Sequence, residues 1–303
     1  MSHHIRYLRK LLAQNGPNPE DYNDLDAWLI ELSEDITQPA SQPASQPASQ
    51  LIENLLSQLG EAASVETMQG FVYCKPHGYA GDYEVIDRIY SRYISEKPSV
   101  RKWDLYCQQH PAVEAVRNRK DYFQHILGNR LMTNGFDQLQ VLNMASGPCR
   151  DLYEFFTNNA TAKITFDCVD QDPNAITYAT NLCQAHLDKI NFIEARAIKF
   201  KSPKKYNLLW SAGLFDYFED KVFVFMLKRL LEMVADDGEI IIGNFSVINP
   251  SRAYMSIFQW NLFHRSPQKL VALAMVAGVP ESAISISREA TGVNLFLHIK
   301  KPF

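Results

Sequence analysis

The sequence predicts an α/β fold, in which a largely parallel sheet ends in an antiparallel hairpin and follows a helical N-terminal region. From about residue 135, strand-like and helix-like segments alternate, and such alternation produces parallel strands covered by helices on both faces. Near the end of the sequence, two short strands are joined by only Thr291 and Gly292. So short a connection forces the two strands to pair antiparallel.

We divide the chain into four segments. A QPAS unit occurs three times in succession, and its prolines remove amide donors and fix φ, so neither helix nor sheet can run through it. We interpret the repeat as a spacer, the alternative being a peptide ligand for another domain. The segments are N-terminal helices (1–37), the QPAS linker (38–50), a helical cap or lid region (51–134) and the α/β domain (135–303).

Seven strands are expected in the α/β domain. Helices follow the first strand from about residue 150 and the second from Pro173, and two more cover residues 219–235 and 266–278. A turn at residues 236–238 opens the fifth strand. The expected strands are residues 138–145, 163–170, 190–197, 206–213, 238–245, 283–290 and 293–300.

Composition excludes several classes of protein. Hydrophobic residues make up 46% and charged residues 21%, which is ordinary for a chain that buries a core. The net charge of -4 and the absence of a basic run argue against a nucleic-acid partner. No apolar stretch approaches the roughly 20 residues that span a bilayer, so we expect no stable membrane insertion. The sequence does not indicate an oligomeric state.

Cysteine and histidine usage predicts a cytoplasmic protein without a metal. Five cysteines form no CxxC pair, and the first residues lack the apolar core of a signal peptide, so we expect reduced thiols. His3 and His4 are adjacent, which can indicate nickel or zinc. Two neighbouring histidines cannot complete a coordination shell alone, so we predict no metal site.

The junction between the first strand and its helix is a candidate ligand site. It reads VLNMASGPCRDL (141–152), and its small side chains let the backbone approach a ligand closely. The free amides of the helix N-terminus can bind a carboxylate, although Pro148 supplies no amide. The alternative is an ordinary strand–helix turn.

Asp170 ends the second strand, 23 residues after Gly147, where a carboxylate can accept both ribose hydroxyls of an adenosine. NAD would require the same aspartate, but its loop should read GxGxxG, and this loop does not. Asp172 either shares this task or caps the next helix, and Pro173 directly after it favours the cap.

This loop resembles the first motif of class I S-adenosylmethionine-dependent methyltransferases, (D/E)xGxGxG. Asn143 takes the acidic position, and Ala145, Gly147 and Cys149 take the glycine positions. The resemblance implies a seven-stranded, Rossmann-like methyltransferase sheet with S-adenosylmethionine as cofactor. The predicted cofactor-binding residues are Asn143, Ala145, Ser146, Gly147, Pro148, Cys149, Asp170, Gln171, Asp172, Arg196, Ala197, Ser211, Gly213, Leu214 and Tyr79.

The other predicted contacts lie at the ends of the third and fourth strands. No clear acidic residue follows the third strand, so we expect adenine to meet the backbone near Arg196 and Ala197. Asp216 and Tyr217, after the fourth strand, either face the acceptor or begin the next helix. Arg117 and Arg119 either reach the carboxylate of the cofactor or, the interpretation we favour, lie on the surface.

A long aromatic segment, residues 243–266, follows the fifth strand, where a substrate lid belongs. The alternative is an extra helix that buries Met255, Phe258, Trp260 and Phe263. We predict that the catalytic residues are Arg252, Tyr254, His264 and Arg265.

Four segments resemble one methyltransferase group in particular. KPHGYAGDYEVIDRIY (75–90), ASGPCRDL (145–152), WSAGLFDYF (210–218) and the aromatic segment are similar to the bacterial group for biosynthesis of the extracellular factor 3-hydroxypalmitic acid methyl ester. The resemblance covers roughly residues 70–300. It implies methylation of the carboxyl group of a 3-hydroxy fatty acid, which yields a quorum-sensing signal. Residues 75–84, which include Tyr79, form either a lid over the cofactor or an interdomain turn.

The acceptor decides which side chains the reaction needs. A carboxylate is ionised at neutral pH and needs no general base, whereas a hydroxyl needs one, and His264 is the best candidate. Arg252 and Arg265 can hold a carboxylate through paired hydrogen bonds. The rival hypotheses are methylation of a hydroxyl or amine on a secondary metabolite, and a non-catalytic S-adenosylmethionine-binding protein.

Overall fold

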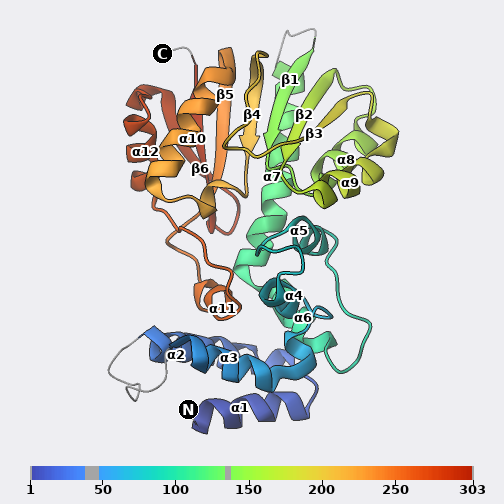
Figure 1. Ribbon diagram of the computed structural model, residues 1–303, viewed down its shortest axis with the longest axis vertical. Coiled ribbons are helices and arrows are strands. Elements are labelled where there is room, and N and C mark those ends of the chain that lie inside the picture. The colour runs from blue at the N-terminus through green and yellow to red at the C-terminus, as the bar shows by residue number, and fades with distance from the viewer. Residues whose placement is uncertain (1, 38–47, 134–137, 302–303) are drawn as a thin grey trace. The chain divides into compact units, whose positions relative to one another are not determined.

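The computed structural model describes residues 2–37, 48–133 and 138–301, and the chain forms two compact units (Figure 1). The helical unit comprises Met1–Glu114 and Pro250–Asn261. The sheet unit comprises Ala115–Asn249 and Leu262–Phe303.

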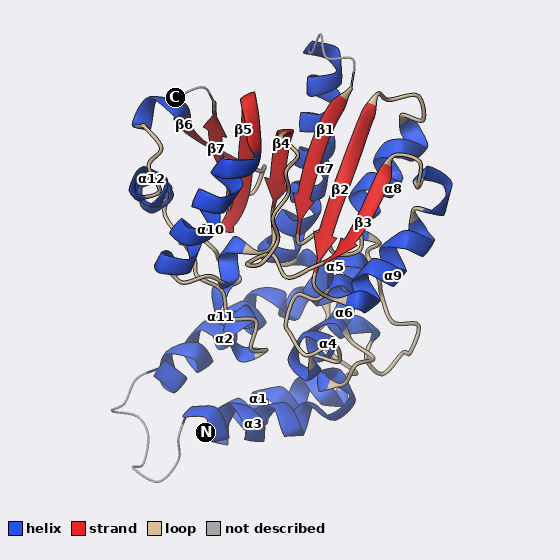
Figure 2. Cartoon of the chain, turned by 45° about the horizontal axis from the view of Figure 1, so that its top comes forward, coloured by secondary structure: helices blue, strands red, loops and turns tan. Residues whose placement is uncertain are grey.

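The sheet unit contains the predicted seven-stranded sheet, with strand order β3-β2-β1-β4-β5-β7-β6 (Figure 2). The first five strands pair in parallel, and β7 pairs antiparallel with both β5 and β6. The α/β fold and the C-terminal antiparallel hairpin are therefore confirmed. The strands are β1 (Leu139–Met144), β2 (Ile164–Asp170), β3 (Ile190–Glu194), β4 (Tyr206–Ser211), β5 (Val234–Phe245), β6 (Ile284–Arg288) and β7 (Asn294–Lys300).

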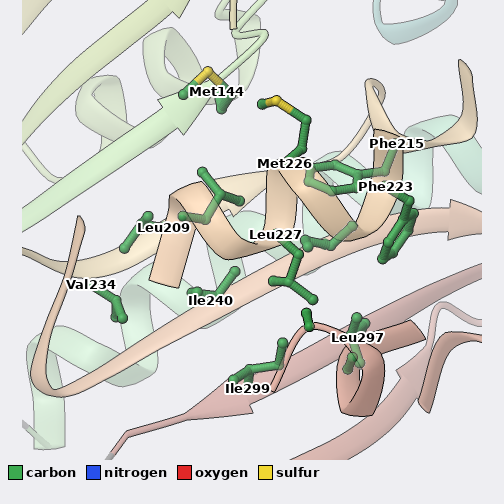
Figure 3. Close-up of a cluster of buried hydrophobic side chains, with 14 of the residues drawn as sticks. Met144, Leu209, Phe215, Phe223, Met226, Leu227, Val234, Ile240, Leu297 and Ile299 are labelled. Atoms are coloured by element: carbon green, nitrogen blue, oxygen red, sulfur yellow. The ribbon is translucent and has the colours of Figure 1, made fainter. Parts of the chain in front are cut away.

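Helices cover both faces of this sheet because its strands alternate buried side chains between two clusters. On one face Val141, Leu208 and Ile241 pack with α7, α8 and α9, and on the other Leu142 and Leu209 pack with α10 and α12. Figure 3 shows the second cluster, in which the α10 side chains meet those of β5 and β7. The helices are α7 (Pro111–Thr133), α8 (Arg150–Asn158), α9 (Pro173–Leu182), α10 (Asp220–Met233) and α12 (Pro267–Val276).

Two strands, β3 and β5, differ most from the prediction at their ends. β3 stops at Glu194, three residues before the expected end at residue 197. β5 starts at Val234, so the expected turn at residues 236–238 lies inside the strand, with Asp237 left-handed at φ 63°. A Cβ at Gly238 would come within 2.7 Å of the Val234 side chain and 3.0 Å of the Tyr206 carbonyl oxygen, so the close approach of β4 requires glycine there.

The helical unit consists of short helices around a buried carboxylate. Asp104 has no exposed surface and accepts hydrogen bonds from the backbone amides of Met68 (2.7 Å) and Ser95 (2.8 Å). These bonds join segments that are far apart in sequence. Its helices are α1 (Ser2–Ala13), α2 (Tyr22–Thr37), α3 (Ala48–Leu59), α4 (Met68–Cys74), α5 (Tyr83–Tyr90), α6 (Arg101–Gln109) and α11 (Arg252–Ile257), and α7 begins in this unit.

The QPAS repeat is only partly described. Helix α3 begins at Ala48, inside the segment expected to be a linker up to residue 50, and residues 38–47 lie outside the described residues. Within the described part of the chain, no helix combines the length and the apolar character needed to cross a membrane.

The aromatic segment after β5 contributes a helix to the helical unit, as the alternative interpretation expected. Met255 and Phe258 are buried, whereas Phe263 is 45% exposed. The ring of Tyr254 stacks on His110 with centroids 4.0 Å apart, and its hydroxyl donates to Gln69 Oε1 at 3.0 Å. Packing against these residues fixes α11 within the unit.

Candidate functional site

The loop after β1 has an unusual backbone. Ala145, Gly147 and Cys149 all adopt the left-handed conformation, with φ of 57°, 57° and 52°. These are the three positions that the sequence aligned with the glycines of the methyltransferase motif. Side chains disfavour this conformation, so the loop keeps the backbone of a glycine-rich motif although two of the three positions are not glycine. A Cβ at Gly147 would meet no described atom within 4 Å, which leaves the space above it open.

Asp170 holds this loop in place from the end of β2. Its Oδ2 accepts a hydrogen bond from the Gly147 amide at 2.9 Å, and its Oδ1 accepts one from the Asp172 amide at 3.0 Å. Burial raises the pKa of this carboxyl, and the two amide hydrogen bonds oppose that shift. The sequence predicted a ribose contact here, and the structure adds a positioning role in the loop.

The side chain of Asp172 caps α9, which confirms the interpretation that the sequence favoured. It accepts a hydrogen bond from the Asn174 amide at 2.9 Å, and Pro173 occupies the first turn. The neighbouring Gln171 is exposed.

Two small side chains of the loop differ in their surroundings. The hydroxyl of Ser146 is buried and has no hydrogen-bond partner among the described residues. A buried hydroxyl of this kind indicates a missing partner, such as a ligand or water. Cys149 is instead buried in the same core cluster as Cys168. A hydrogen bond between the two thiols, together with burial, raises the pKa of Cys149.

The end of β4 lies next to the end of β1, where the strand order reverses. Ligands of open α/β sheets bind in the crevice at such a reversal. Ser211 is buried and donates a hydrogen bond to the Met144 carbonyl at 3.0 Å, so its hydroxyl joins the two strands. Gly213 and Leu214 follow it and are partly exposed. Asn143 is buried within β1, and after β3 Arg196 is exposed and Ala197 partly exposed.

Arg117 and Arg119 are buried, with 8% and 7% of their surface exposed, which contradicts the surface position that the sequence favoured. The guanidinium of Arg119 lies against Gly213, where an added Cβ would be 3.4 Å from Nη1. Within the described residues, Arg119 has no hydrogen-bond or ion-pair partner. Its charge acts on two carboxyl groups: burial raises the pKa of Asp151 and of Asp216 to about 6, and attraction to Arg119 opposes both shifts.

Asp216 lies with Tyr217 in a short 3₁₀ helix, Phe215–Tyr217, ahead of α10. It is 1% exposed, and its Oδ1 accepts a hydrogen bond from the Phe245 amide at 2.6 Å. The carboxylate therefore fastens the turn after β4 to the end of β5.

The guanidinium of Arg265 is a structural cross-link, not the substrate-binding group that the sequence predicted. It is 3% exposed, and Nη1 donates to the Phe215 carbonyl (3.1 Å) and to Asn244 Oδ1 (2.8 Å). Nη2 donates to the Phe218 carbonyl and to Asp220 Oδ1. Because its N–H donors are engaged inside the unit, the side chain has no pair of donors left for a substrate carboxylate.

His264 has both ring nitrogens engaged. Nδ1 lies 3.1 Å from the Leu262 carbonyl oxygen, to which it donates, and Nε2 therefore accepts from the Asn249 side-chain amide at 3.0 Å. A general base needs a free lone pair, so His264 would have to break the contact with Asn249 first.

The other three predicted site residues belong to the helical unit. Arg252 is exposed at the start of α11, Tyr254 is buried in the stack with His110, and Tyr79 precedes α5. Burial raises the pKa of Tyr254, so its hydroxyl remains protonated, as its hydrogen bond to Gln69 requires.

Comparisons with known proteins identify the fold. No family model and no curated protein matches the sequence. A possible exported protein from Bordetella parapertussis aligns with TM-score 0.65 at 18% identity, covering 95% of this chain and 100% of that one. Magnesium protoporphyrin IX methyltransferase from Synechocystis PCC 6803, with bound S-adenosylhomocysteine, aligns with TM-score 0.52 at 10% identity, covering 71% of this chain and 93% of that one.

A third structure, named as a candidate O-methyltransferase from Nostoc punctiforme PCC 73102, gives TM-score 0.50 at 15% identity, covering 61% of this chain and 57% of that one. These likenesses concern the fold, and the strand order agrees with them. The sheet unit has the seven-stranded, Rossmann-like fold of class I methyltransferases.

The left-handed loop predicts an unusual effect of glycine. Ala145→Gly should stabilise the protein by about 0.5–1 kcal/mol. It relieves a left-handed penalty of about 1–2 kcal/mol, and the greater conformational entropy of glycine in the unfolded chain offsets about 0.4–1 kcal/mol of that gain. Ala212→Gly, in the loop after β4 and not left-handed, is the matched control and should destabilise by about 0.5–1 kcal/mol. Chemical denaturation measures both. Equal destabilisation by the two changes would contradict the strained loop.

Proposed function

We propose that this protein is an S-adenosylmethionine-dependent methyltransferase that binds its cofactor over the loop after β1. The observation that carries the proposal is the left-handed backbone at Ala145, Gly147 and Cys149, fastened by Asp170 at the end of β2. Such a backbone lets the adenosine and amino-acid parts of the cofactor approach closely. The orphaned hydroxyl of Ser146 supplies an unused polar group at the same place.

Charge and position assign roles within this site. Asp170 can accept hydrogen bonds from the ribose hydroxyls, and the buried guanidinium of Arg119 can pair with the carboxylate of the cofactor. Gly213 and Leu214 then form the wall at the end of β4, and the adenine meets the segment after β3 near Ala197. The sulfonium methyl group is already activated, so the protein mainly has to orient the acceptor and exclude water.

Two variants test the cofactor site with two ligands. S-adenosylhomocysteine should raise the melting temperature through mass action on the folded state, and NAD should not. In calorimetry, Arg119→Gln should weaken binding of S-adenosylhomocysteine by at least tenfold, since a hydrogen bond to a charged group contributes about 1.5–3 kcal/mol. The same change should leave the binding of methylthioadenosine, which lacks the carboxylate, nearly unaffected. Asp170→Asn should weaken the binding of both ligands.

Lys221→Gln, an exposed change on α10, is the control for charge alone and should behave as wild type. If S-adenosylhomocysteine bound all variants equally, the cofactor would have to bind elsewhere. If Arg119→Gln weakened both ligands alike, the guanidinium would act on the shape of the site rather than on the carboxylate.

We further propose O-methylation of a small lipophilic acceptor, specifically the carboxylate of a 3-hydroxy fatty acid. The similarity of four segments to the 3-hydroxypalmitic acid methyl ester group supports this substrate and a quorum-sensing product. The engaged ring of His264 also favours it, because a carboxylate needs no base and a hydroxyl does. Arg252, exposed on α11, remains the candidate that holds the carboxylate. We propose a cytoplasmic location, consistent with five cysteines that form no disulfide bond among the described residues.

A second candidate function is methylation of a hydroxyl or amine, and a third is cofactor binding without turnover. The acceptor assay separates the first two: initial rates are measured on 3-hydroxy fatty acids, plain fatty acids and phenols. Arg252→Ala should lower kcat/KM for fatty acids at least tenfold, since it removes a charge-assisted pair worth about 1.5–3 kcal/mol. Arg252→Lys should restore part of the activity, because lysine lacks the planar fork.

His264→Ala should lower kcat/KM only slightly. Arg6→Ala, an exposed change on α1, should leave kcat/KM unchanged. Full activity of Arg252→Ala combined with loss of activity in His264→Ala would instead establish a base-assisted hydroxyl acceptor.

A further inference from the structure

Two histidines and two carboxylates converge between α1 and α2. His3 Nε2 lies 3.1 Å from Glu31 Oε1, and His4 Nε2 lies 3.1 Å from Asp35 Oδ2. The two imidazole rings are themselves only 3.8 Å apart between centroids. Sequence reasoning rejected a metal here because two adjacent histidines cannot complete a shell. The fold supplies the missing oxygens from a helix that lies 28 and 31 residues further along the chain.

The donor atoms are close enough to share one ion. Nitrogens of both histidines and an oxygen of Asp35 lie within 4.8 Å of one another. Ligands about 2.1 Å from a tetrahedral zinc ion are about 3.4 Å apart, so the widest pair needs to close by no more than about 1.4 Å. Rotation of the half-exposed side chains of His3 and Asp35 can provide that shift. Glu31 lies outside this group of three but contacts His3, and rotation of its exposed side chain would bring in a fourth donor.

One of the proposed ligands, His4, is buried, and the other three are exposed to solvent. The side chain of His4 is 1% exposed, and its Nδ1 is buried with no hydrogen-bond partner among the described residues. Burial lowers the pKa of His4, and its hydrogen bond to Asp35 opposes that shift. His3 and Glu31 are 54% and 57% exposed, so an ion can enter from solvent.

We propose that His3, His4, Glu31 and Asp35 form a zinc site that fastens the start of α1 to the end of α2. Two imidazoles with two carboxylates match the borderline preference of zinc, whereas calcium and magnesium take oxygen ligands almost alone. Binding replaces the two histidine–carboxylate hydrogen bonds with four bonds to one ion, and any proton that they hold is released. The proposal is independent of the methyltransferase function.

Calorimetry of zinc chloride into the full-length, tag-free protein after treatment with EDTA tests the site. One zinc ion should bind per chain and raise the melting temperature. His3→Ala and Asp35→Asn should each weaken zinc binding at least tenfold. His125→Ala is the matched control, because that histidine lies on α7 beside Asn129 and no carboxylate contacts it among the described residues. It should bind zinc as wild type does.

Cobalt substitution provides a second readout. Tetrahedral coordination should give intense visible absorption in the wild type that is lost in Asp35→Asn. Both His3 and Asp35 are about half exposed, so these variants should fold even if the buried His4→Ala does not. The proposal would be overturned by the absence of stoichiometric binding, by unchanged affinity in His3→Ala and Asp35→Asn, or by an octahedral cobalt spectrum.

Discussion

The carboxylate of Asp170 is the constraint on which the candidate site depends. Its two oxygens accept backbone amides from Gly147 and Asp172, so a single side chain ties the loop after β1 to the start of α9. Together with the bond from the Ser146 amide to the Val169 carbonyl, these bonds hold Ala145 and Cys149 in a conformation that costs each roughly 1–2 kcal/mol. A strained backbone that is held by its surroundings is typical of a ligand site. The loop thus obtains from tertiary hydrogen bonds the conformation that glycines would allow freely.

Electrostatics supports the same location. Asp151 and Asp216 have pKa values raised to about 6 by burial, above the ordinary value of 3.8. A carboxyl group with a raised folded-state pKa stabilises the fold below pH 3.8, and this contribution is lost as the pH rises through about 6. At neutral pH both groups are therefore ionised at a cost, which the nearby guanidinium of Arg119 reduces.

The type and order of the elements could be predicted from the sequence because they depend on local signals. Alternating strand and helix patterns and the two-residue Thr291–Gly292 connection determine the sheet, and Pro173 marks the start of α9. The start of β5 was missed because Asp237 looked like a turn residue, whereas Val234 pairs with Tyr206 across a register shift. That pairing depends on a distant strand, which local pattern does not show.

Some site residues could likewise be located from local signals, whereas the roles of others depend on tertiary contacts. Asp170 and the three left-handed positions could be located because their spacing follows a motif. Arg265 looked available to substrate, but the carbonyls that bind it come from Phe215 and Phe218, about 50 residues earlier in the chain. The burial of Arg119 likewise depends on the packing of α7, and the histidine–carboxylate cluster depends on the pairing of α1 with α2. Such contacts are tertiary, so single-sequence reasoning assigned these residues from their charge alone.

The most direct test of the central claim is methyl transfer. The protein is incubated with methyl-labelled S-adenosylmethionine and a bacterial lipid extract, and the label is followed into organic-soluble products. A methyltransferase of this kind should transfer label to a lipophilic product, and alkaline hydrolysis of that product should release the label as methanol. The Asp170→Asn variant should transfer far less label. Tight binding of S-adenosylhomocysteine without any transfer of label to lipids or to other small molecules would contradict the account and identify a cofactor-binding protein without catalysis.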